Sequence, residues 1–497
     1  MTFRSLRLLA GASLLTLLGA CATVGPDFTP PAAPATSGYA MASDVAAPQA
    51  AVGEQLAGDW WSLFRSPEID QVVRQAVAGN HSLESARASL AQAQHAVLTQ
   101  QGRLTAEASA SAAEQRVNLS AFGFSNLPGP DGPISLENPT FQIYSFGVNG
   151  RYDFDLFGQR RRERENLLAR AEAQGFQTDA AYLTLTAQVV SQAIDIASLK
   201  AQIAAAEEIT ASDQANLNLV TKAFQLGGGT RLDVATVQTE LSSDLATITP
   251  LRQRLATARH ALALLVGQAP ADWAPPEFDL DRIGLPRPVP VALPSELVHA
   301  RPDIRAAEAR LHAATAQIGV AEADRYPKIS LTGNIAQSAL HPQDLFSYDA
   351  TGFSIGPGIT LPLFNRGQTR AREEMARDAA RTALADYQQT VLQAFVQVAD
   401  SLQALAHDDE AVAESVRAEG SASDSLRLQR LRYQDGKAGL LPVLDAQRSY
   451  ARTRLATIRA RAQRLQDSAA LLYAVSRNWD PAATPTTVAA APAAGAP

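Results

Sequence analysis

The chain has 497 residues, 46% of them hydrophobic, which is enough to build the cores of two or more ordinary domains. Its formal net charge of −7 disfavours a general nucleic-acid binder. A single cysteine, Cys21, excludes disulfide bonds within the chain and metal sites made of cysteines.

The first twenty residues have the layout of a secretory signal peptide, with Arg4 and Arg7 before an apolar run over 8–20. The run ends in Leu-Leu-Gly-Ala-Cys, which resembles a bacterial lipobox. The resemblance implies that Cys21 carries diacylglycerol and, with Ala22 after it, that the protein goes to the outer membrane. A plain signal peptide with an accidental cysteine is the alternative. Acyl chains contribute about 0.8 kcal/mol per buried methylene, so several would hold the N-terminus at a bilayer.

Residues 21–58 are rich in Pro, Ala, Ser and Gly without a sustained period, which indicates a lipid anchor followed by an extended strap. The ordered part is expected to begin at Trp60 and Trp61. Over 69–98 apolar residues recur at helical spacing, which predicts one helix that ends near Gly102.

Four segments then alternate apolar and polar residues with a period of two, as strands with one apolar face do. They occupy 104–111, 144–156, 328–335 and 353–363. Their lengths are close to the 9 to 11 residues of a tilted transmembrane strand. A soluble sandwich would show the same alternation. Here, however, the strands cluster as two hairpins beside helices too long for a sandwich, so we favour membrane strands whose connections are exposed loops.

Two long proline-free segments, 160–225 and 370–433, predict helices of about 65 residues, or roughly 100 Å each at 1.5 Å per residue. Each is followed by a glycine-containing turn and a returning helix, so each forms an antiparallel hairpin with a distant tip. Apolar residues at heptad spacing predict coiled packing. The basic residues at 160–164 alternate with glutamates, and we interpret them as a solvated helix face.

Residues of about 83–266 recur, with drift, at about 304–475. Phe224, Gly227, Thr230 and Gln238 of the first copy correspond to Tyr433, Gly436, Gly439 and Gln447 of the second. Repeats this large determine the architecture. The predicted organisation is a signal peptide (1–20), anchor and strap (21–58), repeat 1 (59–267), a Pro-rich connection (268–300), repeat 2 (301–479) and a disordered tail (480–497).

Four strands in hydrocarbon leave two unpaired edges, so the sheet has to close with strands of other copies. Eight strands make a barrel that its own side chains fill, whereas twelve leave a passage. The sequence therefore predicts a mixed α+β membrane protein that works as a trimer with a twelve-stranded β-barrel.

Several motifs, in the same order, resemble the TolC-like outer-membrane efflux factors, specifically their lipoprotein branch, which is often called NodT or OprM-like. The resemblance covers nearly all of the mature chain and implies a homotrimer with a single twelve-stranded β-barrel continued by a long periplasmic α-barrel. This homotrimer docks onto a periplasmic adaptor protein and an inner-membrane RND transporter. Its usual cargo is drugs and other small toxic compounds. The motifs are the lipobox, Trp60-Trp61-Ser62-Leu63-Phe64, Arg301-Pro302-Asp303-Ile304-Arg305-Ala306-Ala307-Glu308, Tyr326-Pro327-Lys328-Ile329-Ser330-Leu331, Pro362-Leu363-Phe364 and Leu444-Asp445-Ala446-Gln447-Arg448.

No catalytic motif is present, and the seven histidines show no ligand spacing. We expect no enzymatic activity, no cofactor and no metal, with His81, His95, His299 and His312 on helix surfaces or at helix ends. The run of three glycines from 227 is expected to be a turn, because no strand precedes it and no Lys-Ser/Thr follows it.

Asp445 follows the second tip turn closely, and from the sequence alone an acid there offsets the helix macrodipole by some 0.3 to 1 kcal/mol. The resemblance instead implies that Asp445 and Leu441 line a periplasmic constriction, with Arg448 beside them. Pro442 departs from the family pattern. The hairpin tips are the expected docking sites for adaptor and pump: Gly227, Gly228, Gly229, Thr230, Gly436 and Gly439.

The predicted function is a passive exit duct of a tripartite RND-type efflux pump, gated at its periplasmic tip. A duct for type I protein secretion shares the architecture and is one alternative. A lipid-anchored periplasmic scaffold without a pore is the other.

Overall fold

The computed structural model describes residues 23–34, 36, 38, 39, 41, 50–52, 59–100, 104–116, 127–129, 132–134, 140–284, 289–291 and 294–476. The predicted signal peptide, the predicted lipidation site Cys21 and the predicted tail 480–497 lie outside these residues. Two compact units divide the chain: unit 1 comprises Met1–Pro30, Gln92–Ala171 and Arg310–Leu384, and unit 2 comprises Pro31–Ala91, Glu172–Ala309 and Ala385–Pro497. In the part of the chain that the structure describes, no helix combines the length and the apolarity needed to cross a membrane.

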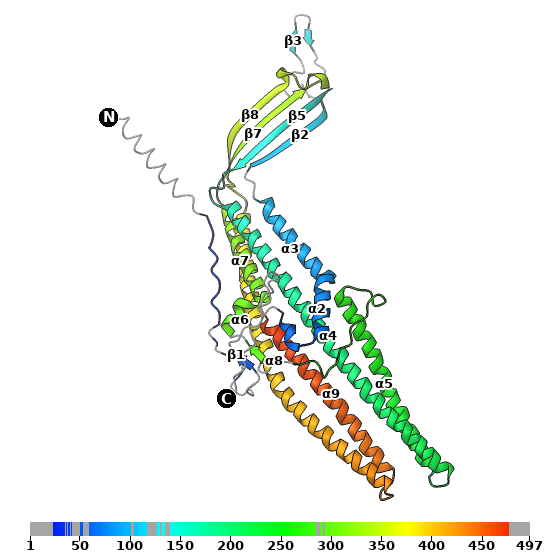
Figure 1. Cartoon of the computed structure of the whole chain (residues 1–497). Helices are drawn as coiled ribbons and strands as arrows, with labels where there is room; N and C mark the ends of the chain where they lie inside the picture. Colours follow the sequence, from blue (N-terminus) through cyan, green and yellow to red (C-terminus); the bar gives the residue numbers. More distant parts are fainter. Residues whose placement is uncertain are drawn as a thin grey trace, which may run out of the picture. The chain divides into compact units, whose positions relative to one another are not determined.

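The long helices are present as predicted (Figure 1). Helix α4 (Gln159–Gln225) and helix α8 (Gln368–Gln434) contain 67 residues each. Turns connect them to α5 (Arg231–Val266) and α9 (Leu441–Val475). The heptad positions are the buried ones, because Ile248 and Leu262 of α5 and Val398 and Leu405 of α8 are at most 4% exposed. Helix α5 continues through Pro250.

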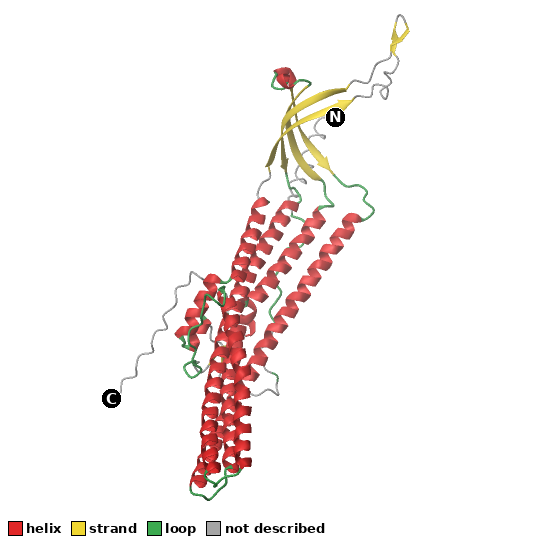
Figure 2. Cartoon of the chain, turned by 90° about the vertical axis from the view of Figure 1, so that its right-hand side faces the viewer, coloured by secondary structure: helices red, strands yellow, loops and turns green. Residues whose placement is uncertain are grey.

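Unit 1 contains a four-stranded antiparallel sheet of strands β2 (Leu104–Arg116), β5 (Thr140–Asp153), β7 (Lys328–Ala339) and β8 (Thr351–Thr360), in the order β2-β5-β7-β8. All four strands were predicted. Figure 2 shows them as one curved sheet. The predicted first loop contains a short hairpin of β3 (Leu127–Gly129) and β4 (Gly132–Ile134). The second contains two 3₁₀ turns, η3 (Pro342–Asp344) and η4 (Tyr348–Ala350).

The prediction of one helix over 69–98 is wrong, since α2 (Pro67–Gly79) and α3 (His81–Thr99) are separated at Asn80. Asn80 has extended backbone angles, with φ −72° and ψ 120°. Its side chain accepts a hydrogen bond from the Leu83 amide and donates one to the Leu265 carbonyl, at 3.0 and 2.9 Å. An asparagine side chain can replace the helical partners of the backbone in this way. The helical period continues across the break, so periodicity does not reveal it.

The two tryptophans lie in the core of unit 2, but the expectation that the ordered part begins at them is wrong, because Ala33 and Tyr39 of the strap pack against the same core. The 3₁₀ helix η1 (Trp60–Phe64) buries Trp60 and Phe64 almost completely, and the Trp60 indole donates to Thr186 at 3.3 Å. Burying an aromatic side chain of this size stabilises a core by roughly 3 to 5 kcal/mol relative to alanine.

The connection 268–300 contributes to the same core, which the sequence analysis did not anticipate. Phe278 and Leu280 are buried in it, and strand β6 (Val289–Val291) and helix α6 (Pro294–Ala300) lie within the connection. Strand β6 pairs in parallel with β1 (Ala50–Val52), which comes from the predicted strap. Helix α7 (Pro302–Ala323) then begins the second copy.

Candidate functional site

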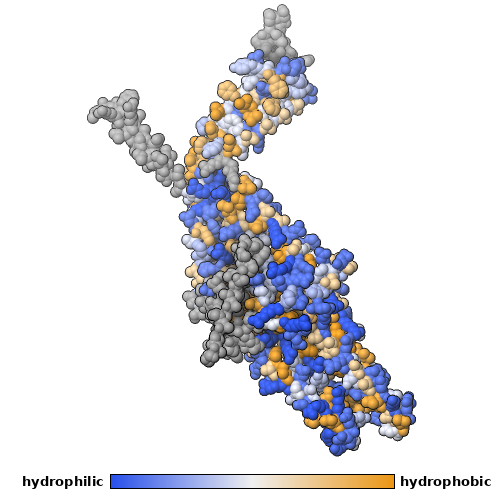
Figure 3. Space-filling view, viewed as in Figure 1, coloured by the Kyte–Doolittle hydropathy of each residue, from blue (hydrophilic) through white to orange (hydrophobic). Residues whose placement is uncertain are grey.

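The sheet of unit 1 has one apolar face and one polar face. Its register aligns Ala108 with Val148, Val148 with Ile335 and Ile335 with Phe353, so the apolar positions of all four strands share a face. The side chains on it are exposed, Phe353 to 82% and Ile335 to 61%, and apolar side chains are visible over the sheet in Figure 3. A contiguous exposed apolar surface marks a site of contact with lipid or protein.

The opposite face of the same sheet is polar. On β5 and β7 it presents Asn149, Arg151, Thr332 and Asn334, which alternate with the apolar residues. Arg151 lies 3.0 Å from Asp153. Membrane strands that surround an aqueous interior have this arrangement, with apolar residues facing outward and polar residues facing inward.

Strands β2 and β8 form the two edges of this sheet. Each pairs on one side only among the described residues, which leaves two rows of backbone N–H and C=O groups. Proteins do not leave such edges open in hydrocarbon, because each unpaired group costs several kcal/mol there.

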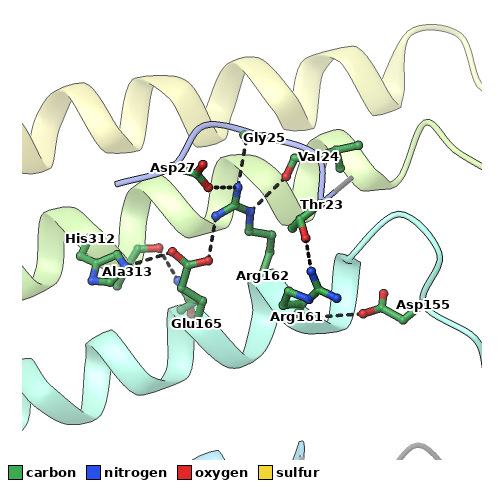
Figure 4. Close-up of polar contacts among 11 residues, drawn as sticks. Thr23, Val24, Gly25, Asp27, Asp155, Arg161, Arg162, Glu165, His312 and Ala313 are labelled. Carbon is green, nitrogen blue, oxygen red and sulfur yellow. Dashed lines mark hydrogen bonds and ion pairs between the residues drawn. The ribbon is translucent and has the colours of Figure 1, made fainter. Parts of the chain in front are cut away.

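A second site in unit 1 holds the beginning of the strap, and Figure 4 shows its polar contacts. Arg162, near the start of α4, is only 3% exposed. Its guanidinium donates to the carbonyls of Val24 and Gly25, each at 3.0 Å, and to Asp27 at 2.7 Å. A fourth bond reaches Glu165 at 2.8 Å. We call this site, formed by Arg162, Gly158 and Gly319, the strap dock.

The prediction that residues 160–164 form a solvated face is therefore wrong for Arg162. The charge is buried because the strap supplies its acceptors, which makes up for the water that is lost. Arg161 is exposed but donates to the Thr23 hydroxyl at 2.7 Å. The carboxylate of Asp155 accepts from the Arg160 and Arg161 amides, at 2.9 and 3.1 Å, and so satisfies two free donors at the start of α4.

The histidine predictions hold for His81, His95 and His299, which are exposed. They are incomplete for His312, whose ring stacks on Phe28 at a centroid distance of 4.4 Å and bonds Glu165 at 3.0 Å. Within the described ranges no cluster of three or more His, Cys, Asp or Glu residues is suited to hold a metal ion.

The hairpin tips of unit 2 are exposed turns. Gly227 and Gly436 have φ values of 79° and 70°, which favour glycine and end α4 and α8. Thr230 caps α5: its hydroxyl accepts from the Asp233 amide at 3.2 Å, and its amide donates to the Asp233 carboxylate at 2.9 Å. The Thr230 hydroxyl also donates to the Asp233 carboxylate at 2.6 Å, and this bond, followed by the one from the Thr230 amide, lowers the pKa of Asp233. Gly228 and Gly439 are exposed and Gly229 is half-buried.

The structure places the three predicted gate residues on the first two turns of α9. Leu441, its first residue, is 60% exposed, and the Asp445 side chain is 63% exposed. Arg448 lies 3.5 Å from Asp445, and its guanidinium also forms a bidentate ion pair with Glu240 of α5. The bond to Glu240 raises the pKa of Arg448. Arg448 therefore connects the second hairpin to the first.

The sequence analysis missed the contacts of two buried polar residues near the predicted gate residues. Gln447 of α9 is 4% exposed, accepts from Asn216 at 3.1 Å and donates to Asp213 of α4. Asp213 is 1% exposed, and burial, followed by the neighbouring Asp244 carboxyl, raises its pKa to about 7. Gln447 occupies the place of Gln238 in the first copy, which is exposed, so the repeat pattern gives no sign of this contact.

An apolar cluster lies beside these polar groups. Val220 of α4, Val237 of α5 and Leu444 of α9 are each at most 5% exposed and pack together. The first turns of α9 therefore pack against both helices of the first hairpin, while Leu441 and Asp445 remain exposed.

Comparisons with known proteins agree with this architecture. The family model for outer membrane efflux proteins matches residues 72–268 and 293–476. The pyoverdine export outer membrane protein OpmQ of Pseudomonas aeruginosa is 28% identical over 468 residues, which cover 94% of this chain and 97% of that protein. Nodulation protein T of Rhizobium leguminosarum bv. trifolii is 28% identical and covers 94% and 96%.

Among solved structures, the outer-membrane channel OprN superposes on the chain with a TM-score of 0.79. It is 27% identical, and the match covers 92% of this chain and 99% of that one.

Proposed function

Because the chain belongs to the outer membrane efflux protein family and is thus the outer-membrane channel component of an efflux system, we propose that three copies form one passive exit duct. The observation that carries this proposal is the sheet of unit 1, which has an exposed apolar face and two open edges. Closure of β8 of one copy against β2 of the next satisfies both edges. Three copies supply twelve strands, the smallest number that leaves a passage.

In this assembly the apolar face contacts lipid and the polar face lines the passage. Each copy contributes the same two structural repeats, whose long helices continue the barrel into the periplasm. Cys21 carries the acyl chains that add an anchor at the outer membrane. The duct performs no covalent chemistry and needs no cofactor.

The exposed first turns of α9 supply the gate. Under threefold symmetry Leu441 and Asp445 each form a ring around one axis, where an apolar ring resists wetting and a carboxylate ring attracts cations. The bidentate pair between Arg448 and Glu240 supports a closed resting state, because it holds α9 against the first hairpin. Outward rotation of the hairpins opens the path.

The partners that drive this rotation are a periplasmic adaptor protein and an inner-membrane RND transporter, which engage the hairpin tips. The exposed turns at Gly227–Thr230 and Gly436–Gly439 support this assignment. The cargo class is drugs and other small toxic compounds. The names of the two relatives specify different roles, pyoverdine export and nodulation, which supports a duct that does not itself select its cargo.

Planar-bilayer conductance tests the proposal. Purified wild-type protein should give small, cation-preferring openings, and Asp445→Ala and Leu441→Ala should each enlarge them, with the double variant largest. Asp424→Ala, at an exposed position of α8, is the control and should behave as wild type. If neither the wild type nor any variant conducts, the duct is refuted. If the wild type conducts and the variants do not differ from it, only the gate assignment fails. A deletion strain tested against dyes and antibiotics defines the cargo.

A further inference from the structure

The strap dock is shaped for the segment Thr23–Asp27. Arg162 has five N–H donors in a rigid planar fork, and three of its four hydrogen bonds go to this segment. Two of the three acceptors are backbone carbonyls, which fix the path of the chain and not merely the position of one side chain.

Three glycines allow the segment to approach the body of unit 1 this closely. A Cβ atom at Gly25 would lie 2.4 Å from the Gly319 Cα, and one at Gly158 would lie 2.7 Å from the Thr23 Cγ2. A Cβ at Gly319 would meet both the Arg162 side chain, at 2.8 Å, and the Val24 carbonyl, at 2.9 Å. These distances are too short for a Cβ atom. The strap can therefore lie this close to the body of unit 1 only because all three positions are glycine.

The dock lies at the end of strand β5. Strand β5 ends at Asp153, and the Phe154 amide still donates to the Ile329 carbonyl of β7 at 3.1 Å. Only three residues later, the Phe157 carbonyl accepts from the Val24 amide at 3.2 Å. Cys21 precedes Thr23 by two residues, which can span at most roughly 7 Å.

We propose that the strap dock is the positioning site of the lipid anchor: Arg162, with Gly158 and Gly319, holds the chain just after Cys21 so that the acyl chains enter the bilayer beside the end of β5. The inference rests on the proposed lipidation of Cys21 and on the membrane sheet. It goes beyond them because a tether needs only the acyl chains, whereas a docked tether also fixes the depth of the anchor relative to the apolar face. Because the depth of the anchor is fixed, the dock then limits the hydrophobic mismatch between the apolar face of the sheet and the hydrocarbon of the bilayer.

Hydrogen exchange of the full-length lipidated protein in lipid discs tests the dock. Arg162→Met keeps the apolar stem of the side chain but removes its donors. It should speed exchange of the Val24 amide by about 10- to 100-fold, as expected for the loss of charge-assisted bonds to a buried group. Exchange in β5 and β7 should not change. Arg164→Met, at an exposed position on the same helix, is the matched control. Equal exchange of the 23–34 segment in Arg162→Met and wild type overturns the dock.

If Arg162 only stabilised the packing of α4 and α7, Arg162→Met would speed hydrogen exchange in these two helices as well as in the strap. Gly25→Ala separates the two roles, because its Cβ would lie 2.4 Å from the Gly319 Cα and would not meet the Arg162 side chain. It should release the strap alone. Faster exchange throughout unit 1 in both variants would overturn the positioning role.

A photoreactive fatty acid incorporated at Cys21 tests where the acyl chain lies. In the wild type it should cross-link to the peptide that contains Phe154–Phe157, and in Arg162→Met this cross-link should disappear. Unchanged cross-links would refute the fixed position. The same spectra report the acyl mass on Cys21. If that mass is absent, the proposed anchor fails, and the positioning role fails with it, whereas the exchange experiment still decides whether the strap is docked.

Discussion

Replacing Asp213 with asparagine should remove a pH dependence from the tip of the first helical hairpin. The carboxyl is buried between α4 and its neighbours, where Asp244, Glu240 and Arg430 are the charged groups around it. Its Oδ1 accepts from Gln447, and no donor in the described part of the chain reaches its Oδ2. The charged form is therefore disfavoured, which raises the pKa of Asp213 from 3.8 to about 7.

The sign follows from proton binding. Between about pH 4 and pH 7 the folded hairpin holds a proton that the opened hairpin releases, so the free energy of opening falls as the pH rises. The stabilising contribution is complete below pH 4 and lost above pH 7. A shift of about three pKa units corresponds to about 4 kcal/mol over the whole window, and roughly half of it is lost between pH 5 and pH 7.

Hydrogen exchange of the peptides that cover α4 and α5 near the tip measures this loss, after correction for the intrinsic exchange rate. Protection in the wild type should fall by roughly 50-fold between pH 5 and pH 7. Asp213→Asn resembles the protonated acid and should stay level over the same range. Asp424→Asn, whose side chain is 72% exposed in the wild type, should follow the wild type. Parallel profiles for wild type and Asp213→Asn would show that this carboxyl does not hold the proton.

Two further pairs of variants test the packing. Leu444→Ala empties part of the buried cluster at the tip and should destabilise the hairpins by about 3 kcal/mol, whereas Leu441→Ala, at a 60% exposed position, should leave their chemical denaturation unchanged. Gly267→Ala places a Cβ 2.1 Å from the Gly79 carbonyl at a φ of 78° and should lower the thermal midpoint of the helical signal. Gly284→Ala, which has open space around it, should not; equal midpoints would contradict the close approach.

Local periodicity was sufficient for most of the fold. The strands followed from alternation over short runs, as around Val148 and Ile335, and both long helices from the absence of proline and the high helix propensity of their residues. Such signals depend only on neighbours in the sequence, because an element with one buried face has an apolar residue at every helical turn or at every second strand position. The break at Asn80 escaped this reasoning, because asparagine is not a strong helix breaker and its partners lie partly in α5.

The predicted gate and the strap dock differ in how many of their contacts can be predicted from the sequence. Asp445 and Arg448 are three residues apart on one helix, so their contact can be predicted from spacing. The partner of Arg448, Glu240, lies 208 residues away. Arg162 was misjudged for the same reason, since the neighbouring glutamates suggested a solvated face while its acceptors lie 135 to 138 residues earlier. Pairs this distant are decided by packing, which a single sequence does not reveal.

Closure of the sheet between copies is tested most directly by disulfide cross-linking of its two edges. Ala108→Cys on β2 can be combined in turn with cysteine at Phe353, Ile355 or Ile359 on β8, which lie on the same face of the sheet. At least one combination should give, after oxidation in native membranes, a species of three covalently joined chains and nothing larger. A scan that yields only monomers, or chains that extend beyond three, would contradict a closed sheet of three copies.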